Sequence, residues 1–523
     1  MSNATRQIAR AAGTVMFAFV LNSLMGLLRQ VLITRAFGTD AALDAFYAAS
    51  RLPEILFSLI AGGALASAFI PTFTGYLQKE DSPKASQDAW HLASSVANLV
   101  GLTLAAVSAI AWVFAPQLVG GVLVPEFSTI QQSLTVELLR IQLLTPVIFG
   151  LSGLLMGVLN AHQRFFLPAL APSMLWFGII LSIFIFVPSM GIHGLAWGAV
   201  LGSLLHLGVQ LPALLRLRPQ YSPTLGLRLP GVRQVGRLMA PRLLGVAVVQ
   251  LNFLVNTIVA SGMAAGSLAA ITVAFSVMLM PQQAIGQAIA IAALPTFSAQ
   301  FARGNLAELR SSLVSTLRGI IFLALPASIG LILLRQPVIA LLFQRGEFGP
   351  DDTQLVAWAL LWYAAGLVGH SVVEIASRAF YALQDTRTPV MVGVGAMGLN
   401  VVLSLTLPAL FARAGWMPHG GLALANSTAT FLEMLVLLWL MRRRLGGLEE
   451  GRLLRGAGQS ALASAAMFAA LWGWLAYAHG QPLWLQALGG VAAGGLVYAA
   501  AAWLLRVPEL ADVLAQVRAR VSR

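Results

Sequence analysis

Ile70-Pro71-Thr72-Phe73 returns later in the chain as Leu294-Pro295-Thr296-Phe297. Two further patterns follow each copy in the same order. Ala161-x-Gln163 with Pro168 returns as Ala382-x-Gln384 with Pro389, and Gly194-Leu195-Ala196 returns as Gly421-Leu422-Ala423. Any one of these matches could arise by chance. Because all three recur in one order at nearly one spacing, we predict an internal duplication.

The composition indicates a membrane protein. The chain of 523 residues is 58% hydrophobic and 10% charged, with a mean hydropathy of +0.82, whereas soluble domains carry about 25% charged residues. Apolar runs of about 20 residues, long enough to cross a bilayer as helices, predict an all-α polytopic protein of about fourteen spans. They lie near 11–34, 46–70, 90–114, 132–158, 166–187, 192–215, 235–261, 268–298, 313–334, 355–382, 389–412, 419–441, 455–477 and 483–505.

Each copy of the duplication holds six spans, so the two copies share one orientation in the membrane, and a duplicated helical bundle is typical of secondary transporters. Proline inside a span can kink a helix, which we expect at Pro53, Pro146, Pro281 and Pro326. We predict an N-terminal lobe over 1–220, a cytoplasmic linker over 221–234, a C-terminal lobe over 235–445, helices thirteen and fourteen over 446–507, and a cytoplasmic amphipathic tail over 508–523.

The net charge of +13 reflects topology rather than nucleic-acid binding. Most of the 32 Lys and Arg fall at the N-terminus, in alternate loops and at the C-terminus; one such loop runs from Arg216 to Arg237 and another from Arg442 to Arg455. This positive-inside bias predicts that both termini lie in the cytoplasm. The same side chains can contact anionic lipid headgroups. We expect membrane lipids as partners and no nucleic acid.

Charged residues within spans need an explanation, because a charge in the bilayer is costly. Glu374 and Arg378 are spaced i,i+4 and can form an ion pair. Arg29 has two interpretations: facing a cavity, its planar guanidinium suits a phosphate or diphosphate, and near the outer surface it can extend to the headgroups. Asp44 can pair with Arg29 or Arg51.

No motif for catalysis or nucleotide binding is present. The chain has no Cys, and its seven His are scattered without ligand spacing, so we predict no metal site and no cofactor. We therefore expect a transporter rather than an enzyme. Without an ATP site, transport must draw on an ion gradient, the membrane potential or the gradient of the substrate itself.

Several motifs resemble one family over nearly the whole chain. The stretch Arg378-Ala-Phe-Tyr-Ala-Leu-Gln-Asp-Thr-Arg-Thr-Pro389 resembles the loop between helices ten and eleven of the lipid II flippases, the MurJ/MviN family of the multidrug/oligosaccharidyl-lipid/polysaccharide exporter superfamily. Leu342-Phe-Gln-Arg-Gly-Glu-Phe348 and Leu159-Asn-Ala-His-Gln-Arg-Phe165 resemble its segments after helices nine and four.

The resemblance implies a function. Such proteins carry the lipid-linked peptidoglycan precursor from the cytoplasmic to the outer leaflet of the bacterial plasma membrane by alternating access. Two lobes enclose a cationic cavity, and helices thirteen and fourteen shape a groove for the lipid tail. The resemblance implies cavity roles for Arg29, Asp44, Arg51 and Arg140, and structural or gating roles for Glu374, Arg378, Asp385 and Arg387.

The chain also departs from the family pattern. Arginines that the family usually has are replaced by Ser23, Phe57 and Ser276, and Arg242 is a candidate to compensate. The possible ion site of the family corresponds to Asn256 and Ser404, beside Asn400. These amide and hydroxyl oxygens carry no charge, whereas hard cations favour charged oxygen ligands.

Four hypotheses follow. The first is a lipid II flippase with a remodelled cavity, which we expect to act as a monomer. The second is a flippase for another polyprenyl-diphosphate-linked glycan, which the replaced arginines favour. The third is a drug or cation exporter, for which only Asp44 and Glu54 supply acid in the first lobe. The fourth is a non-transporting scaffold for cell-wall enzymes.

Overall fold

The protein is built from helices. The computed structural model describes residues 3–60, 64–78 and 83–511, and every regular element within these ranges is helical. In this part of the chain ten helices are long and apolar enough to cross a membrane, or eleven if one bent pair is a single span. Because lipid offers no partner to a backbone amide, helices satisfy these groups internally. The predicted all-α polytopic class is confirmed, and the count of fourteen stays a prediction.

The chain forms two compact units, Met1–Leu268 and Ala269–Arg523. By packing, the helix Pro230–Ser261 belongs to the first unit, although its sequence begins the second copy of the duplication. The predicted boundaries at 220, 234 and 445 rest on sequence repetition and stay a prediction.

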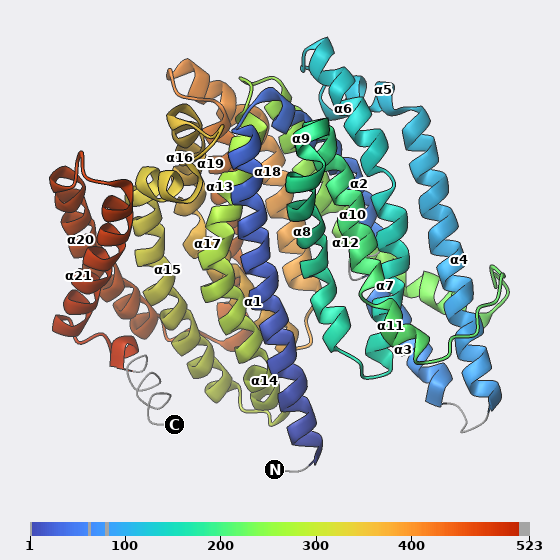
Figure 1. The fold of residues 1–523 in the computed structure, drawn as a ribbon. Coiled ribbons are helices and arrows are strands. Elements are labelled where there is room, and N and C mark those ends of the chain that lie inside the picture. Colours follow the sequence, from blue (N-terminus) through green and yellow to red (C-terminus); the bar gives the residue numbers. More distant parts are fainter. Residues whose placement is uncertain (1–2, 61–63, 79–82, 512–523) are drawn as a thin grey trace. The chain divides into compact units, whose positions relative to one another are not determined.

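The helices of the first unit pack mainly as neighbouring pairs, with α1 beside α8, α8 beside α10, and α12 against α2 and α3 (Figure 1). Its elements are α1 (Asn3–Phe37), α2 (Ala41–Ile60), α3 (Ala64–Gln78), α4 (Pro83–Val113), α5 (Ala115–Leu118), the π-helix η1 (Val119–Leu123), α6 (Thr129–Gln142), α7 (Thr145–Ala161), α8 (Phe166–Ile185), α9 (Val187–Met190), α10 (Ile192–Gly208), α11 (Leu211–Leu215) and α12 (Pro230–Ser261).

The predicted fourth span matches one candidate span, Thr129–Ala161, which consists of α6 and α7 with a short break between them. Ser128 caps the start of α6 by accepting a hydrogen bond from the Gln131 backbone N–H at 3.3 Å. The helix ends at Gln142, and Pro146 lies in the first turn of α7, where its missing N–H costs no helical hydrogen bond. Pro146 therefore lies directly after a break within the span, and the expected kink stays a prediction. Pro53, Pro281 and Pro326 do lie inside helices, as expected.

The second unit contains the predicted tenth span as a bent pair, because α16 and α17 meet at Gly366 with an angle of 44°. Its elements are α13 (Ser267–Gln282), which begins at the boundary, the π-helix η2 (Gln283–Gln287), α14 (Ala288–Ala302), α15 (Leu306–Phe343), α16 (Pro350–Ala365), α17 (Leu367–Ala382), α18 (Arg387–Arg413), α19 (His419–Leu445), α20 (Glu450–Tyr477), the π-helix η3 (Leu485–Gly489) and α21 (Gly490–Leu504).

The duplicated Ala-x-Gln motif adopts one backbone conformation in both units. Gln163, after α7, has φ 60°, and Gln384, after α17, has φ 59°. In each copy the glutamine N–H donates to the carbonyl three residues earlier and the next N–H donates to the carbonyl five residues earlier. A left-handed residue with this bonding pattern ends a helix and satisfies its last carbonyls. The repetition detected in sequence is therefore also a repetition of local structure.

The segment before α12 has no regular secondary structure over 218–226 and is held against α4. Asn98 donates hydrogen bonds to the carbonyls of Ser222 and Thr224, at 3.1 and 2.8 Å. Tyr221 donates from its hydroxyl to Asn98 Oδ1 at 2.9 Å, and the Ser222 N–H donates to Ser94 Oγ at 3.1 Å. Side chains of α4 thus bond to the backbone of this segment, whereas 230–234 of the predicted linker belong to α12.

Helices α20 and α21 lie side by side and pack against α15 (Figure 1). Arg318 of α15 forms an ion pair with Glu509, Nε to Oε1 at 2.6 Å, and the two side chains are only 8% and 12% exposed. The Arg318 guanidinium fits because Gly456 of α20 has no Cβ: one built there would meet Nε at 2.4 Å. Of the predicted amphipathic tail, 508–511 is helical and 512–523 lies outside the described residues.

We expect Glu509→Ala to destabilise the protein by about 3–5 kcal/mol, because it leaves the Arg318 charge buried without a partner. The measurement is thermal and chemical unfolding of the detergent-solubilised protein. The control is Glu347→Ala at an exposed loop position. Equal unfolding of Glu509→Ala and wild type would show that the pair contributes no net stability.

Candidate functional site

A cavity of about 430 Å³ lies inside the first unit. Helices α1, α2, α6, α8, α10 and α12 and the start of α7 contribute its wall, so residues far apart in the sequence meet there. The lining residues are Arg29, Phe46, Tyr47, Ser50, Arg51, Pro53, Glu54, Phe57, Ser58, Gln142, Thr145, Phe149, Leu175, Trp176, Ile179, Ala199, Gln250 and Phe253.

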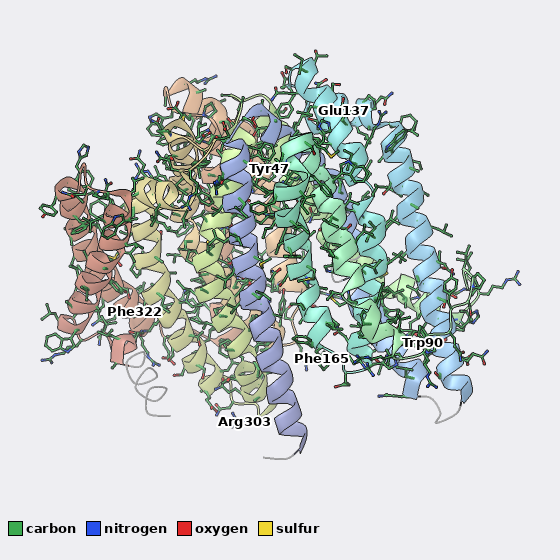
Figure 2. All side chains as sticks on the ribbon, in the orientation of Figure 1. Tyr47, Trp90, Glu137, Phe165, Arg303 and Phe322 are labelled. Carbon is green, nitrogen blue, oxygen red and sulfur yellow. The ribbon has the colours of Figure 1, made fainter. Side chains whose placement is uncertain are left out.

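Arg29 is held in the wall on two sides. Its guanidinium carbon lies 4.2 Å from the centroid of the Trp176 ring of α8, a cation–π contact. Its Nη2 donates to Gln30 Oε1 at 3.1 Å, and the buried Gln30 amide in turn donates to the Tyr47 hydroxyl at 2.8 Å. Tyr47 is marked within the first unit in Figure 2. The cation is thereby fixed by neutral groups.

One donor of this guanidinium is not used. Arg29 Nε is buried and has no hydrogen-bond partner among the described residues. A buried donor without an acceptor is unfavourable, and arginine carries five N–H groups in a rigid fork that matches carboxylate and phosphate. Arg29 therefore lines the cavity with a donor that is not paired within the described protein, and its role toward a phosphate stays a prediction.

Arg51 supplies the second cation of the cavity. Its Nη1 lies 2.9 Å from Glu54 Oε2, with the side chains 14% and 56% exposed. Its Nε donates to Thr257 Oγ1 at 3.3 Å, and Phe253 lies with its ring centroid 5.4 Å from the guanidinium carbon. Glu54 reaches solvent, so this ion pair is weak and exchangeable. Two arginines and one glutamate leave the cavity with net positive charge.

Aromatic rings occupy much of the remaining wall. Phe57 and Phe149 pack with ring centroids 4.8 Å apart, and Phe149 meets His206 edge-on at 5.3 Å. Behind them, Ser152 Oγ lies 2.6 Å from His206 Nδ1, and Gln210 Nε2 donates to Ser152 Oγ at 2.8 Å. Phe57, where the family pattern has arginine, thus replaces a charge by an apolar surface.

The other replaced positions also lack a charge. Ser23 donates its hydroxyl to the Phe19 carbonyl at 3.1 Å, and Ser276 of the second unit donates to the Val273 carbonyl at 2.7 Å. Both hydroxyls bond within their own helix, so neither replaces the reach of an arginine.

Asp44 lies away from the cavity wall. The carboxylate is only 2% exposed and accepts a hydrogen bond from the Gly266 backbone N–H at 2.7 Å. Gly266 has φ +86°, and a Cβ there would meet the Thr39 carbonyl oxygen at 2.0 Å. Asp44 therefore fastens α2 to the segment before α13. The ion pair predicted with Arg29 or Arg51 stays a prediction.

Arg140 also lies outside the residues that line the cavity. Its Nε donates to the Trp112 carbonyl at 3.3 Å, and its guanidinium carbon lies 4.6 Å from the Trp112 ring centroid. These contacts explain how the cation is accommodated on α6 without an acid. The side chain of Arg242 lies outside the described residues. Substrate roles for Asp44, Arg140 and Arg242 stay predictions.

In the second unit, the residues of the loop motif are tied together locally. Arg378 Nη2 lies 3.5 Å from Glu374 Oε2, the pair that their spacing predicts. Asp385 accepts hydrogen bonds from the Thr388 N–H at 3.0 Å and its hydroxyl at 2.8 Å, and these bonds lower the pKa of Asp385. Their stabilisation is present above the unfolded-state pKa and is lost as pH falls through the folded-state value. Arg387 is exposed at the start of α18.

The possible ion-site residues are all buried. Asn256 is in α12 of the first unit, whereas Asn400 and Ser404 are in α18 of the second, where Ser404 Oγ donates to Asn400 Oδ1 at 3.1 Å. Within the described residues, no group of three or more His, Cys, Asp or Glu could hold a metal ion. Ion binding at these positions stays a prediction.

Sequence reasoning missed Gln30, Tyr47, Gln142 and Trp176. Charge within a span was the signal used, and it finds Arg29 and Arg51 but not the neutral groups around them. No spacing in the sequence shows that Trp176, on another helix, faces Arg29.

Comparison with known proteins places the chain clearly. A family model described as "Lipid II flippase MurJ" matches residues 33–487. The lipid II flippase MurJ of Burkholderia cenocepacia is 32% identical over 447 residues, 83% of this chain and 84% of that protein. A probable lipid II flippase MurJ of Rhizobium meliloti is 28% identical and covers 98% of this chain and 97% of its own length.

Solved structures show the same fold. "Lipid II flippase MurJ, inward closed conformation" matches with a TM-score of 0.80 at 24% identity, covering 96% of this chain and 99% of that one. An inward-facing multidrug resistance MATE family transporter of the MOP superfamily matches with a TM-score of 0.64 at 17% identity, covering 82% of this chain and 96% of that one.

The contact between Asp44 and Gly266 gives a test of the local structure. We expect Gly266→Ala to destabilise the protein by roughly 1–2 kcal/mol or more, since alanine is strained at positive φ and its Cβ meets backbone. The matched control is Gly236→Ala in α12, where a Cβ meets nothing within 4 Å and alanine favours the helix. Thermal unfolding compares the two; equal midpoints would contradict the contact.

Proposed function

The chain belongs to the MurJ family of lipid II flippases, and from this membership we propose that it moves lipid II from the cytoplasmic to the outer leaflet of the bacterial inner membrane. Three observations support the proposal: the family match over most of the chain, helices suited to several membrane crossings, and a positively charged cavity inside the first unit.

The contacts of the Arg29 guanidinium are the observation that best supports the proposal. The head of lipid II contains a diphosphate, whose oxygens accept hydrogen bonds and carry charge. Arg29 presents a guanidinium that is fixed by Trp176 and Gln30 and retains an unused buried donor. Charge-assisted hydrogen bonds to phosphate are roughly twice as strong as neutral ones. We assign Arg29 to the diphosphate.

Arg51 takes the second position beside the diphosphate. In the structure its charge is balanced by Glu54, which is 56% exposed. A diphosphate can displace this carboxylate, because the pair is open to solvent and loses little when it separates. Glu54 then keeps the cavity from holding the anion too tightly to release it.

Transport follows by alternating access: the head group enters the cavity from the cytoplasmic side, the lobes rock, and the head group leaves on the outer side. The basic loops support an orientation with both termini in the cytoplasm. The energy comes from the membrane potential or an ion gradient, since the sequence contains no nucleotide site. We propose a monomer as the working unit, with membrane lipids around it.

A second candidate is a flippase for another polyprenyl-diphosphate-linked glycan. The neutral residues Ser23, Phe57 and Ser276, where the family pattern has arginines, favour it. The diphosphate is common to both substrates, so the two candidates differ only in the glycan.

We expect Arg29→Ala to lower lipid II translocation by about 10- to 100-fold, the effect of losing a charged hydrogen-bond partner. Proteoliposomes report translocation through an enzyme added outside that acts on exposed head groups. Arg413→Ala, at an exposed position at the end of α18, is the matched control, and unfolding temperatures verify that each variant is folded.

A fully active Arg29→Ala protein would show that Arg29 is not needed to bind the diphosphate. Preferential movement of a different polyprenyl-linked glycan by the wild type would select the second candidate. Movement of neither lipid by folded protein, with an imposed membrane potential and ion gradient, would favour a scaffold without transport.

A further inference from the structure

Beside its arginines, the cavity contains a second kind of polar group. Gln142, at the end of α6, lines the cavity and is 3% exposed. Its amide lies 2.8 Å from Ser50 Oγ of α2, and the same hydroxyl, which has a single proton, lies 2.9 Å from the Phe46 carbonyl oxygen. The other polar atom of the amide is buried and has no hydrogen-bond partner in the described structure. One end of the amide is therefore fixed and the other end is unused.

The unpaired amide atom of Gln142 lowers the stability of the folded protein. An amide group that is removed from water and left unpaired destabilises the folded protein. If Gln142 served only to hold Ser50, its second polar end would gain nothing from burial in this wall. An unpaired amide atom at a cavity wall is explained by a hydrogen-bonding group that arrives with the ligand. The terminal torsion of glutamine is broad, so the amide can turn to meet it.

The residues that line the cavity with Gln142 indicate the chemical character of the ligand group that would meet its amide. Thr145, Phe149 and Phe57 line the same cavity and carry no charge, and Phe57 and Phe149 form a continuous aromatic surface with centroids 4.8 Å apart. Gln250 of α12 adds a second neutral amide to the lining. Aromatic surface with a few neutral hydrogen-bonding groups suits an uncharged polar ligand, whereas the charged groups are Arg29, Arg51 and Glu54.

We propose that Gln142 binds a hydroxyl of the glycan, which can both donate and accept a hydrogen bond, and so distinguishes a glycan-bearing lipid from a bare polyprenyl diphosphate. The proposal rests on the proposed function, because it assumes that Arg29 takes the diphosphate of the same molecule. Within one cavity, the arginines supply affinity for the anion and the amide supplies selectivity for the sugar.

The experiment measures the dissociation constants of lipid II and of the bare polyprenyl diphosphate with the full-length protein in nanodiscs. Gln142→Leu and the nearly isosteric Gln142→Met remove the amide without adding charge. We expect either variant to bind lipid II about tenfold more weakly, the effect of one lost hydrogen bond and an unmatched polar group, and to bind the bare diphosphate as wild type does. Gln354→Leu, at an exposed position of α16, is the matched control.

Arg29→Ala separates the two proposals, since we expect it to weaken both ligands. If Arg29→Ala changes neither, the diphosphate role fails, while the ratio of the two affinities in Gln142→Met still decides the role of the amide. An unchanged ratio in folded Gln142→Met, whether both affinities stay or both fall, overturns the glycan contact. Should Gln142→Leu fail to fold, Gln142→Met provides the deciding measurement.

Discussion

The absence of hydrogen-bond partners in lipid is the constraint on which the rest of this structure depends. Every backbone amide within the bilayer must bond to the chain itself. The described residues therefore form helices, and at helix ends other groups satisfy the backbone hydrogen bonds. Gln163 and Gln384 end helices with the same left-handed turn, and Pro146 begins a helix where its missing N–H costs nothing.

The same constraint governs the charged side chains. Arg318 forms an ion pair with Glu509, and Asp44 accepts a hydrogen bond from the Gly266 backbone N–H. Both contacts hold separate segments of the chain together. Arg29 differs because the groups in contact with it, Trp176 and Gln30, are neutral, and the charge of Glu54 acts on it without an ion-pair contact. An arginine held in this way is the group that we assign to an anionic substrate. This difference separates the group assigned to the substrate from those that stabilise the fold.

In the proposed function, the cavity combines two kinds of recognition. Arginine binds phosphate strongly but does not distinguish between the groups attached to the phosphate. A neutral amide contributes less affinity and more selectivity, because a ligand without a matching hydrogen-bonding group leaves the amide unpaired. Phe57 fits this division, since its phenyl ring adds apolar surface to the cavity that Gln142 also lines.

The sequence by itself determined the helical class, because hydropathy is a local property that survives without coordinates. It also determined the Glu374–Arg378 pair, which depends only on helical spacing, and its repeated motifs and intramembrane charges predict the duplication and the charged members of the site. Only the tertiary structure decided that Trp176 faces Arg29, that Asp44 accepts a hydrogen bond from the Gly266 backbone, and that one polar atom of the Gln142 amide is left unpaired. These facts depend on which helices pack together, and contacts between residues distant in sequence leave no periodic trace along the chain.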